Sequence, residues 1–370
     1  MKVSILFCGD YPGFGAAANR LMHYEIGLRA AGCDVMTVSI PAHSRQYNHF
    51  YKLLIPFLVL NRTLNIRKRS NIVLVYGFGW CSILAICLGV CFSGAKVILE
   101  INEKPGTCYT NWFSEIKPFK IFNYLCLTHF AFPLLDGFIV ISQALESYIS
   151  GHKSSHATVI KIPILISKDR CNISNLPAIS MNKPFMLHAG ALSDKKDGIL
   201  NVIKAFAIVC NKRDKNFHFY LTSKVAPKYL LDEIDVIIKD HKLEDNIHFL
   251  GNISHEELVA YQKECSLVVI NKPVNEQNLF NFPTKIAECL AMGIPIITTD
   301  IGELGHFLTD NVNALLIKDE SCEAIADKIQ YVLTNPELIH DILINGKVTV
   351  AEKFDAIGHG ERLRLFFERL

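Results

Sequence analysis

The chain has 370 residues, and 38 Lys and Arg against 36 Asp and Glu give it a formal net charge of +2. At about 100–200 residues per domain, this length suggests two domains, and the 50% of hydrophobic residues is ample for two cores. The 12 cysteines form no C-x-x-C pair, which argues against a disulfide framework or a zinc ribbon and for buried thiols in a reducing compartment.

The charge is unevenly distributed along the chain. Residues 1–175 hold 17 Lys and Arg and 9 Asp and Glu, a net charge of +8, whereas the remainder holds 21 and 27, a net charge of −6. A basic N-terminal half indicates an anionic partner, which could be a membrane surface, a phospholipid-like acceptor or a nucleic acid. Chance is the alternative.

The first element is predicted to be a strand over 3–8, too short and too soon interrupted to be a signal peptide. Gly13, Gly15 and Ala18 then form a G-x-G-x-x-A pattern before a helix over 17–31. This loop could bind a phosphate of a donor or an acceptor, because helix N-termini attract anions. It could also be a structural turn or a dinucleotide site, although the next strand, 35–40, ends without the acidic residue that would hold a ribose.

Two apolar stretches come next in the chain. Residues 49–70 mix apolar and basic side chains, so they form either a helix on an anionic membrane interface or an ordinary helix with a solvated basic end. Residues 72–95 carry no charge and are long enough to span a bilayer. However, Gly77, Gly79 and Gly94 divide residues 72–101 into strand, helix and strand, which is the pattern of a buried parallel sheet.

The remainder of the chain continues this alternation. Further strands are expected over 137–142 and 158–162, then a polar linker, and then a second series of strands and helices from Phe185 onward. In that series Ser254 and Glu257 have the spacing of a helix capping box. Such alternation predicts parallel sheets with helices on both faces.

The second series opens with a candidate phosphate loop. A strand ending at His188 is followed by Gly190, then by Lys195 and Lys196, then by a helix. A lysine there can reach an anion lying over the strand ends and neutralise a departing diphosphate. The alternative is a solvated pair of lysines.

The most informative stretch is 278–299. A helix with Pro283 in its first turn and Gly293 at its end presents free amide groups over 282–285, with Glu288 one turn further on. These amides can hold a diphosphate, and the carboxylate can accept hydrogen bonds from two ribose hydroxyls. Alternatively, Glu288 only offsets the helix dipole.

This stretch resembles the donor-binding signature of retaining GT-B glycosyltransferases of family 4, the glycosyl transferases group 1 type. That signature reads P-[ST]-K-x-x-E-x-L-A-x-G-x-P-[VI]-[IV], and each fixed position is met here. The resemblance extends over nearly the whole chain, from the loop 13–20 and the strand 135–142 to the stretch 354–370.

The resemblance implies roles for particular residues. Glu288 would hold the nucleotide ribose, and Lys196, with Lys195, would contact the donor diphosphate. Amides of the segment from Phe282 would touch sugar or phosphate. The implied donor-binding set is completed by Gly13, Gly15, Gly190, Pro283, Thr284 and Lys285.

The chain also departs from the family pattern. Phe280 stands where the family often has a sugar-contacting Glu, for which Glu276 could substitute, and Ala191 replaces a common Arg. In place of the usual His of the N-terminal domain, the chain has an E-x-N-E-x-P variant seen in polysaccharide-building members. Its Asn102 and Glu103 end a strand at the expected cleft, so we expect them to face the acceptor; a surface turn is the alternative.

The fold expected from the resemblance is α/β of the GT-B type, with two Rossmann-like domains whose parallel sheets face each other across a cleft. The expected parts are an N-terminal acceptor-side domain (1–170), a linker (171–183), a C-terminal donor-nucleotide-binding domain (184–353) and a C-terminal helix (354–370) returning to the N-terminal domain.

The expected function is retaining transfer of a sugar from a UDP- or GDP-sugar to a glycan or lipid-linked saccharide in cell-surface polysaccharide biosynthesis. We expect no metal, no cofactor beyond the nucleotide-sugar co-substrate and no nucleic-acid partner. The expected location is cytoplasmic, with peripheral contact at an anionic inner membrane face. A nicotinamide-dependent oxidoreductase and a non-catalytic sugar-nucleotide or membrane-binding module are the alternatives.

Overall fold

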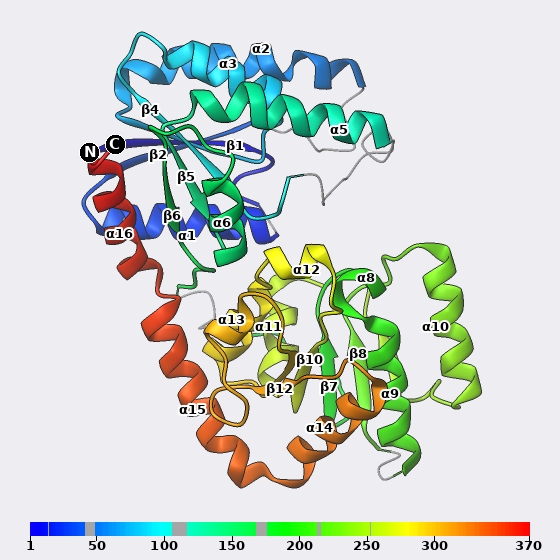
Figure 1. Cartoon of the computed structure of the whole chain (residues 1–370). Helices are drawn as coiled ribbons and strands as arrows, with labels where there is room; N and C mark the ends of the chain where they lie inside the picture. The colour runs from blue at the N-terminus through cyan, green and yellow to red at the C-terminus, as the bar shows by residue number, and fades with distance from the viewer. Residues whose placement is uncertain (14, 41–48, 106–116, 168–175, 213–215, 252) are drawn as a thin grey trace. The chain divides into compact units, whose positions relative to one another are not determined.

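The computed structural model describes the whole chain except residues 14, 41–48, 106–116, 168–175, 213–215 and 252 (Figure 1). The chain divides into two compact units. Unit 1 contains Met1–Leu165, Phe280–Phe282 and Asp355–Leu370, and unit 2 contains Ile166–Leu279 and Pro283–Phe354. Of the linker predicted over 171–183, the first five residues lie outside the described residues, and 176–183 is irregular.

Unit 1 is built on a parallel sheet of six strands among the described residues, in the order β2-β1-β3-β4-β5-β6. These strands are β1 (Lys2–Cys8), β2 (Asp34–Ile40), β3 (Ile72–Tyr76), β4 (Lys96–Ile101), β5 (Gly137–Val140) and β6 (Thr158–Lys161). Its principal helices are α1 (Ala16–Ala30), α2 (His49–Ile66), α3 (Trp80–Val90), α5 (Lys117–Cys126), α6 (Gln143–Ser150) and α16 (Ala356–Glu368).

The two faces of this sheet are covered by different helices. Figure 1 shows α1 and α16 on one side and α2, α3 and α5 on the other. Leu21 and Leu28 of α1 share a core with Leu363 and Phe366 of α16. The charge-free stretch 72–95 is therefore a buried strand and a helix that lead into the next strand, as its glycines predicted. None of the helices in the described part of the chain has the length and hydropathy of a membrane span.

Unit 2 has a second six-stranded parallel sheet within the described residues, in the order β12-β11-β10-β7-β8-β9. These strands are β7 (Phe185–His188), β8 (His218–Leu221), β9 (Ile247–Phe249), β10 (Leu267–Ile270), β11 (Ile296–Thr299) and β12 (Leu315–Ile317). Its helices are α8 (Asp194–Asp197), α9 (Ile199–Lys212), α10 (Lys228–Asp240), α11 (His255–Glu264), α12 (Glu276–Phe280), α13 (Thr284–Met292), α14 (Cys322–Thr334) and α15 (Pro336–Lys353).

Local sequence signals set the ends of these helices. The predicted capping box is present at α11, where the Ser254 hydroxyl accepts from the Glu257 amide and the Glu257 carboxylate accepts from the Ser254 amide. Gly293 ends α13 in the left-handed conformation, with φ of 71°. One detail of the prediction is wrong: Pro283 is the N-cap of α13 rather than part of its first turn, because it is extended, with ψ of 117°.

Candidate functional site

Parallel α/β sheets bind ligands at the carboxyl ends of their strands. In unit 2, the candidate site therefore lies at the carboxyl ends of β7 and β10. At the end of β7 the chain turns through Gly190, whose φ of 107° is a conformation that favours glycine. The Gly190 amide donates to the Thr222 hydroxyl at 2.9 Å. A Cβ at Gly190 would lie 3.1 Å from the Lys285 ammonium. The loop after β7 and the first turn of α13 are therefore in contact, as a shared phosphate site requires.

The short helix α8 carries the two predicted lysines. Its N-cap Ser193 accepts a hydrogen bond from the Lys196 amide at 3.0 Å. The Lys195 side chain is exposed, whereas that of Lys196 is half-buried. The helix ends at Gly198, with φ of 50°, where a Cβ would lie 2.2 Å from the Asn271 amide nitrogen. The turn therefore requires glycine for both its conformation and its space.

A buried lysine that sequence reasoning missed holds this helix in place. Lys272 follows β10, is 7% exposed, and its ammonium lies 2.6 Å from the Asp197 carboxylate. The same ammonium donates to the Lys196 carbonyl oxygen at 3.1 Å. Despite its burial, Asp197 has a lowered pKa, because the Lys272 and Lys285 ammonium groups stabilise its charge.

Two asparagines add to these contacts of Lys272, and we call the whole set the Lys272 clamp. Asn278 donates to the Lys196 carbonyl oxygen at 3.2 Å and to the Pro273 carbonyl oxygen at 2.8 Å. Asn275 donates to the Lys195 carbonyl oxygen at 2.8 Å. The backbone on which Lys195 and Lys196 sit is thus fixed by side chains 76 to 82 positions away in sequence.

The predicted anion site over 282–285 coincides with the N-terminus of α13, where Pro283 itself contributes no N–H. Its N-cap Pro283 supplies no side-chain cap, and Thr284 and Lys285 are the first helical residues. Unsatisfied amides at a helix N-terminus are a ready-made anion site. Glu288, one turn further on, is half-buried, whereas Phe282 is buried and is grouped with unit 1.

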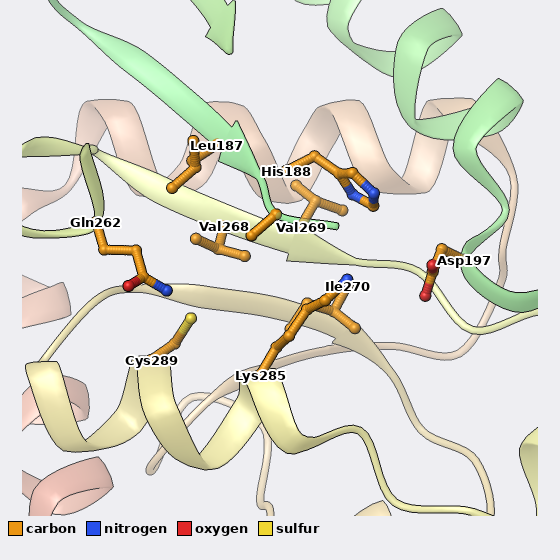
Figure 2. Close-up of a pocket in the computed structure, with 10 residues that line it drawn as sticks. Leu187, His188, Asp197, Gln262, Val268, Val269, Ile270, Lys285 and Cys289 are labelled. Carbon is orange, nitrogen blue, oxygen red and sulfur yellow. The ribbon is translucent and has the colours of Figure 1, made fainter. Parts of the chain in front are cut away.

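His188 lies beneath this loop, in a small cavity. The cavity has a volume of about 10 Å³, roughly one water, and its lining includes Asp197, Gln262, Lys285 and Cys289. Figure 2 shows the Lys285 side chain rising from α13 toward the strand ends, near His188. The His188 Nε2 atom is buried, with no hydrogen-bond partner among the described residues. Burial, assisted by the Lys285 ammonium, lowers the pKa of His188 to about 3, so the imidazole is neutral at pH 7.

The predicted acceptor residues lie in unit 1, at the end of β4. Asn102 donates to the Tyr76 hydroxyl at 2.6 Å, and its Oδ1 is buried without a hydrogen-bond partner in the described part of the chain. Glu103 follows it and is half-buried. An unmatched buried carbonyl oxygen is costly unless something donates to it, so the Asn102 side chain is suited to accept from a ligand.

Glu100, the first residue of the same motif, has a structural position instead. It is buried and pairs with the fully buried Arg20 at 2.5 Å, and the Tyr24 hydroxyl donates to it at 2.7 Å. Arg20 also donates to the Pro163 carbonyl oxygen at 2.7 Å and to the Ile162 carbonyl oxygen at 2.8 Å. This network fixes the end of β4 from which Asn102 and Glu103 project.

The glycine loop of unit 1 is described apart from residue 14. A Cβ at Gly13 would lie 2.4 Å from the Asp10 carbonyl oxygen, so this glycine is required by the turn itself. Gly15 is the N-cap of α1, with φ of 123°, and no atom lies within 4 Å of a Cβ placed there. The open side of the loop is therefore at Gly15.

Part of the chain that contains this site matches a known protein family. Residues 169–349, which include the Gly190 loop, α8 and α13, match the model of the family described as glycosyl transferases group 1. We call the matched segment, residues 169–349, the group 1 domain. The group 1 domain thus contains the Lys272 clamp and the His188 cavity described above.

The chain is also similar to individual glycosyltransferases. An uncharacterized glycosyltransferase from Methanocaldococcus jannaschii is 27% identical over 165 residues, 44% of this chain and 42% of that protein. The matches to curated relatives therefore span less than half of those proteins' length.

Solved structures resemble the whole chain. Sucrose-phosphate synthase from Thermosynechococcus elongatus has a TM-score of 0.73 at 17% sequence identity. Anabaena HepE in complex with UDP has a TM-score of 0.69 at 15% sequence identity. Each comparison covers 100% of both chains. This likeness confirms the predicted fold class, α/β of the GT-B type.

The site has no metal-binding cluster that the described residues reveal: no group of three or more His, Cys, Asp or Glu side chains among them could hold a metal ion. The ammonium groups of Lys196 and Lys285 lie close enough to that of Lys272 to lower its pKa, although its burial is the main cause of this shift. Independence from metal stays a prediction.

Proposed function

We propose that the chain is a retaining glycosyltransferase of family 4 that moves a sugar from a UDP- or GDP-sugar to a glycan or lipid-linked saccharide. The observation that carries this proposal is the contact between the Gly190 loop and Lys285 at the start of α13. That contact brings a lysine, loop amides and helix amides to one edge of the sheet. The structure of HepE with UDP supports a uridine nucleotide as the ligand of such a site.

In the proposed reaction, the bond between the anomeric carbon and the β-phosphate oxygen breaks. The acceptor oxygen forms a bond to the same carbon on the same face, and its proton passes to the departing phosphate oxygen. Lys196 and the first amides of α13 offset the negative charge that grows on the diphosphate. The reaction requires no metal and no protein nucleophile. Glu288 accepts hydrogen bonds from the ribose.

The acceptor side of the proposal rests on unit 1. The Oδ1 atom of Asn102 accepts a hydrogen bond from an acceptor hydroxyl, and Glu103 lies beside it. A lipid-linked acceptor in cell-surface polysaccharide biosynthesis places the enzyme in the cytoplasm, in peripheral contact with the inner face of the membrane. The excess positive charge of residues 1–175 supports this location.

The first test is thermal unfolding with UDP, GDP, ADP, CMP and NAD. A ligand at about 100 times its Kd adds about 2.7 kcal/mol of stability, so UDP or GDP should raise the midpoint visibly. Glu288→Ala should abolish this rise, whereas the exposed first-turn Glu256→Ala of α11 should retain it. A rise with NAD alone would favour an oxidoreductase instead.

Turnover is tested separately, by nucleotide release from UDP-sugars and GDP-sugars with a panel of saccharide acceptors. Lys196→Ala should lower kcat about 10²–10³-fold, as for loss of a typical charge stabiliser, and Lys239→Ala on α10 serves as the control. Normal turnover in Lys196→Ala would remove its proposed role. Nucleotide binding without turnover on any acceptor would favour a non-catalytic module.

A further inference from the structure

Apolar side chains are gathered on the surface of unit 1 where α3 ends. Leu88 is 63% exposed, Phe92 is 93% exposed and Leu134 is 52% exposed. The Cys87 thiol lies 3.9 Å from the Leu134 carbonyl oxygen, so the segments carrying these side chains are neighbours. Leu88 and Leu134 line an open groove of about 620 Å³ whose lining is mostly apolar. Such a surface marks an interaction site.

Basic side chains border the same surface. The 3-10 turn Arg67–Arg69 follows α2, and the Arg67 guanidinium donates to the Gly89 carbonyl oxygen at 3.5 Å, beside Leu88. Lys96 lines the groove and pairs with Asp136 at 3.0 Å. Because the charges of Lys96 and Asp136 cancel, the net positive charge of this surface comes from Arg67, Lys68 and Arg69. We call the surface the basic apolar face; it consists of Leu88, Phe92, Leu134, Arg67, Lys68 and Arg69.

The sequence around this face has one sign of charge. Residues 35–99 contain seven Lys and Arg and not one Asp or Glu. Unit 2 offers a contrast, because its exposed Tyr229 (70%) and Val236 (56%) share α10 with Asp232, Glu233 and Asp235. An anionic surface would be repelled from α10 but attracted to the basic apolar face.

We propose that the basic apolar face binds the surface of an anionic lipid bilayer. Phe92 and Leu88 enter the boundary between headgroups and acyl chains, the groove receives acyl carbon, and Arg67, Lys68 and Arg69 contact lipid phosphates. Stable binding at the membrane interface requires two contributions, the burial of apolar side chains and the attraction of basic side chains to anionic lipid. The inference rests on the peripheral location within the proposed function and extends it by naming the surface that makes the contact.

The test is co-sedimentation of the full chain with vesicles of phosphatidylcholine containing about one third phosphatidylglycerol, compared with pure phosphatidylcholine. Binding should require the anionic lipid and weaken at about 0.5 M NaCl. Each basic residue near such a surface raises the affinity for the membrane about fivefold. The triple variant Arg67→Gln/Lys68→Gln/Arg69→Gln should therefore bind the vesicles about 100-fold more weakly. Leu88→Ser/Phe92→Ser should also weaken it.

Matched controls lie on α10. Tyr229→Ser should leave vesicle binding unchanged, and so should Lys228→Gln/Lys239→Gln, whose side chains are exposed. Equal binding to both vesicle types would overturn the proposal, as would retention of binding in the two face variants. If light scattering shows a dimer that Leu88→Ser/Phe92→Ser dissociates, the face joins two copies of the chain instead.

The face variants also separate this inference from the proposed function. They should retain the UDP-induced rise in unfolding midpoint, because the altered residues lie outside the donor site. Loss of vesicle binding with retained UDP binding supports the face. Absence of a UDP effect in the unaltered chain, with vesicle binding intact, would contradict the transferase proposal alone.

Discussion

His188 is an ionisable side chain in a place where its charged form is penalised. Burial lowers its pKa to about 3, and the Lys285 ammonium adds to the effect. In the unfolded chain the imidazole takes up a proton near pH 6.5. Between these two values the unfolded state binds more protons, so the free energy of unfolding falls as the pH falls.

The stability of the protein should depend on pH through His188. Between pH 6.5 and pH 5, protonation of this imidazole in the unfolded chain should lower the free energy of unfolding by roughly 2 kcal/mol, at about 1.4 kcal/mol per pH unit. His188→Gln should lose that part of the pH dependence in urea denaturation at pH 7 and pH 5. The exposed His306→Gln is the control and should keep it. Equal pH dependence in all three proteins would show that the buried imidazole is not the cause.

At the scale of single residues, the sequence singles out Lys196 as a candidate, because it follows a glycine loop after a strand, but it does not reveal the side chains that hold the Lys196 backbone. Lys272 looks like any lysine after a strand, and only folding brings Asp197, 75 positions away, to its ammonium. The Arg20–Glu100 pair is hidden for the same reason, since 80 positions separate the partners. Charge pairs between distant segments leave no local pattern.

At the scale of elements, two glycines allow α1 and α16 to approach closely. A Cβ at Gly360 would lie 2.1 Å from the Gly27 carbonyl group, and one at Gly27 would lie 2.2 Å from the Ala356 carbonyl oxygen. Both contacts are with backbone atoms, which cannot rotate away. The separation of the two helices is therefore set by the absence of side chains at these positions.

Substitution on α16 tests this contact. Gly360→Ala should destabilise unit 1 by about 2 kcal/mol or more, because the helices must separate. Gly358→Ala on the same helix meets only the Asp355 carboxylate, at 3.6 Å, and should be neutral or stabilise by up to about 1 kcal/mol through helix propensity. The measurement is the denaturant midpoint of both variants. A milder effect at Gly360 than at Gly358 would contradict the close approach.

Most elements were predictable because their signals are local. Strands appeared as short apolar runs between glycines, and the capping box at Ser254 and the stop at Gly293 fixed helix ends. The short helix α12 was not predicted as an element of its own. Its Asn278 binds the Lys196 backbone, so it depends on a partner distant in sequence.

At the scale of the whole molecule, the sequence offers two candidate places for the nucleotide, the proposed donor site in unit 2 and the glycine loop of unit 1. The group 1 domain contains Gly190, Lys196 and Glu288, whereas Gly13 and Gly15 belong to unit 1. Gly13 is required by its own turn. The proposed function therefore assigns the nucleotide to unit 2.

Hydrogen exchange with and without UDP tests this assignment. UDP should slow exchange most strongly at the amides of 190–196 and 284–288, because a nucleotide bound at the proposed site covers these two segments and reduces their local opening. The amides at the start of α1, from Ala16 onward, serve as the internal comparison. Strongest protection at the start of α1 would place the nucleotide in unit 1 and contradict the donor site.

The packing of α16 on α1 also has a consequence for the order in which the chain folds during synthesis. Unit 1 has its first 165 residues early, but its α1 face is completed only by Asp355–Leu370. At about 5–20 residues per second, the intervening residues take roughly 10–40 s to make. During that time Leu21, Tyr24 and Leu28 lack the apolar partners on α16. The part of the chain translated second can therefore finish folding first, while the apolar side chains of α1 stay without their α16 partners until the end of the chain emerges.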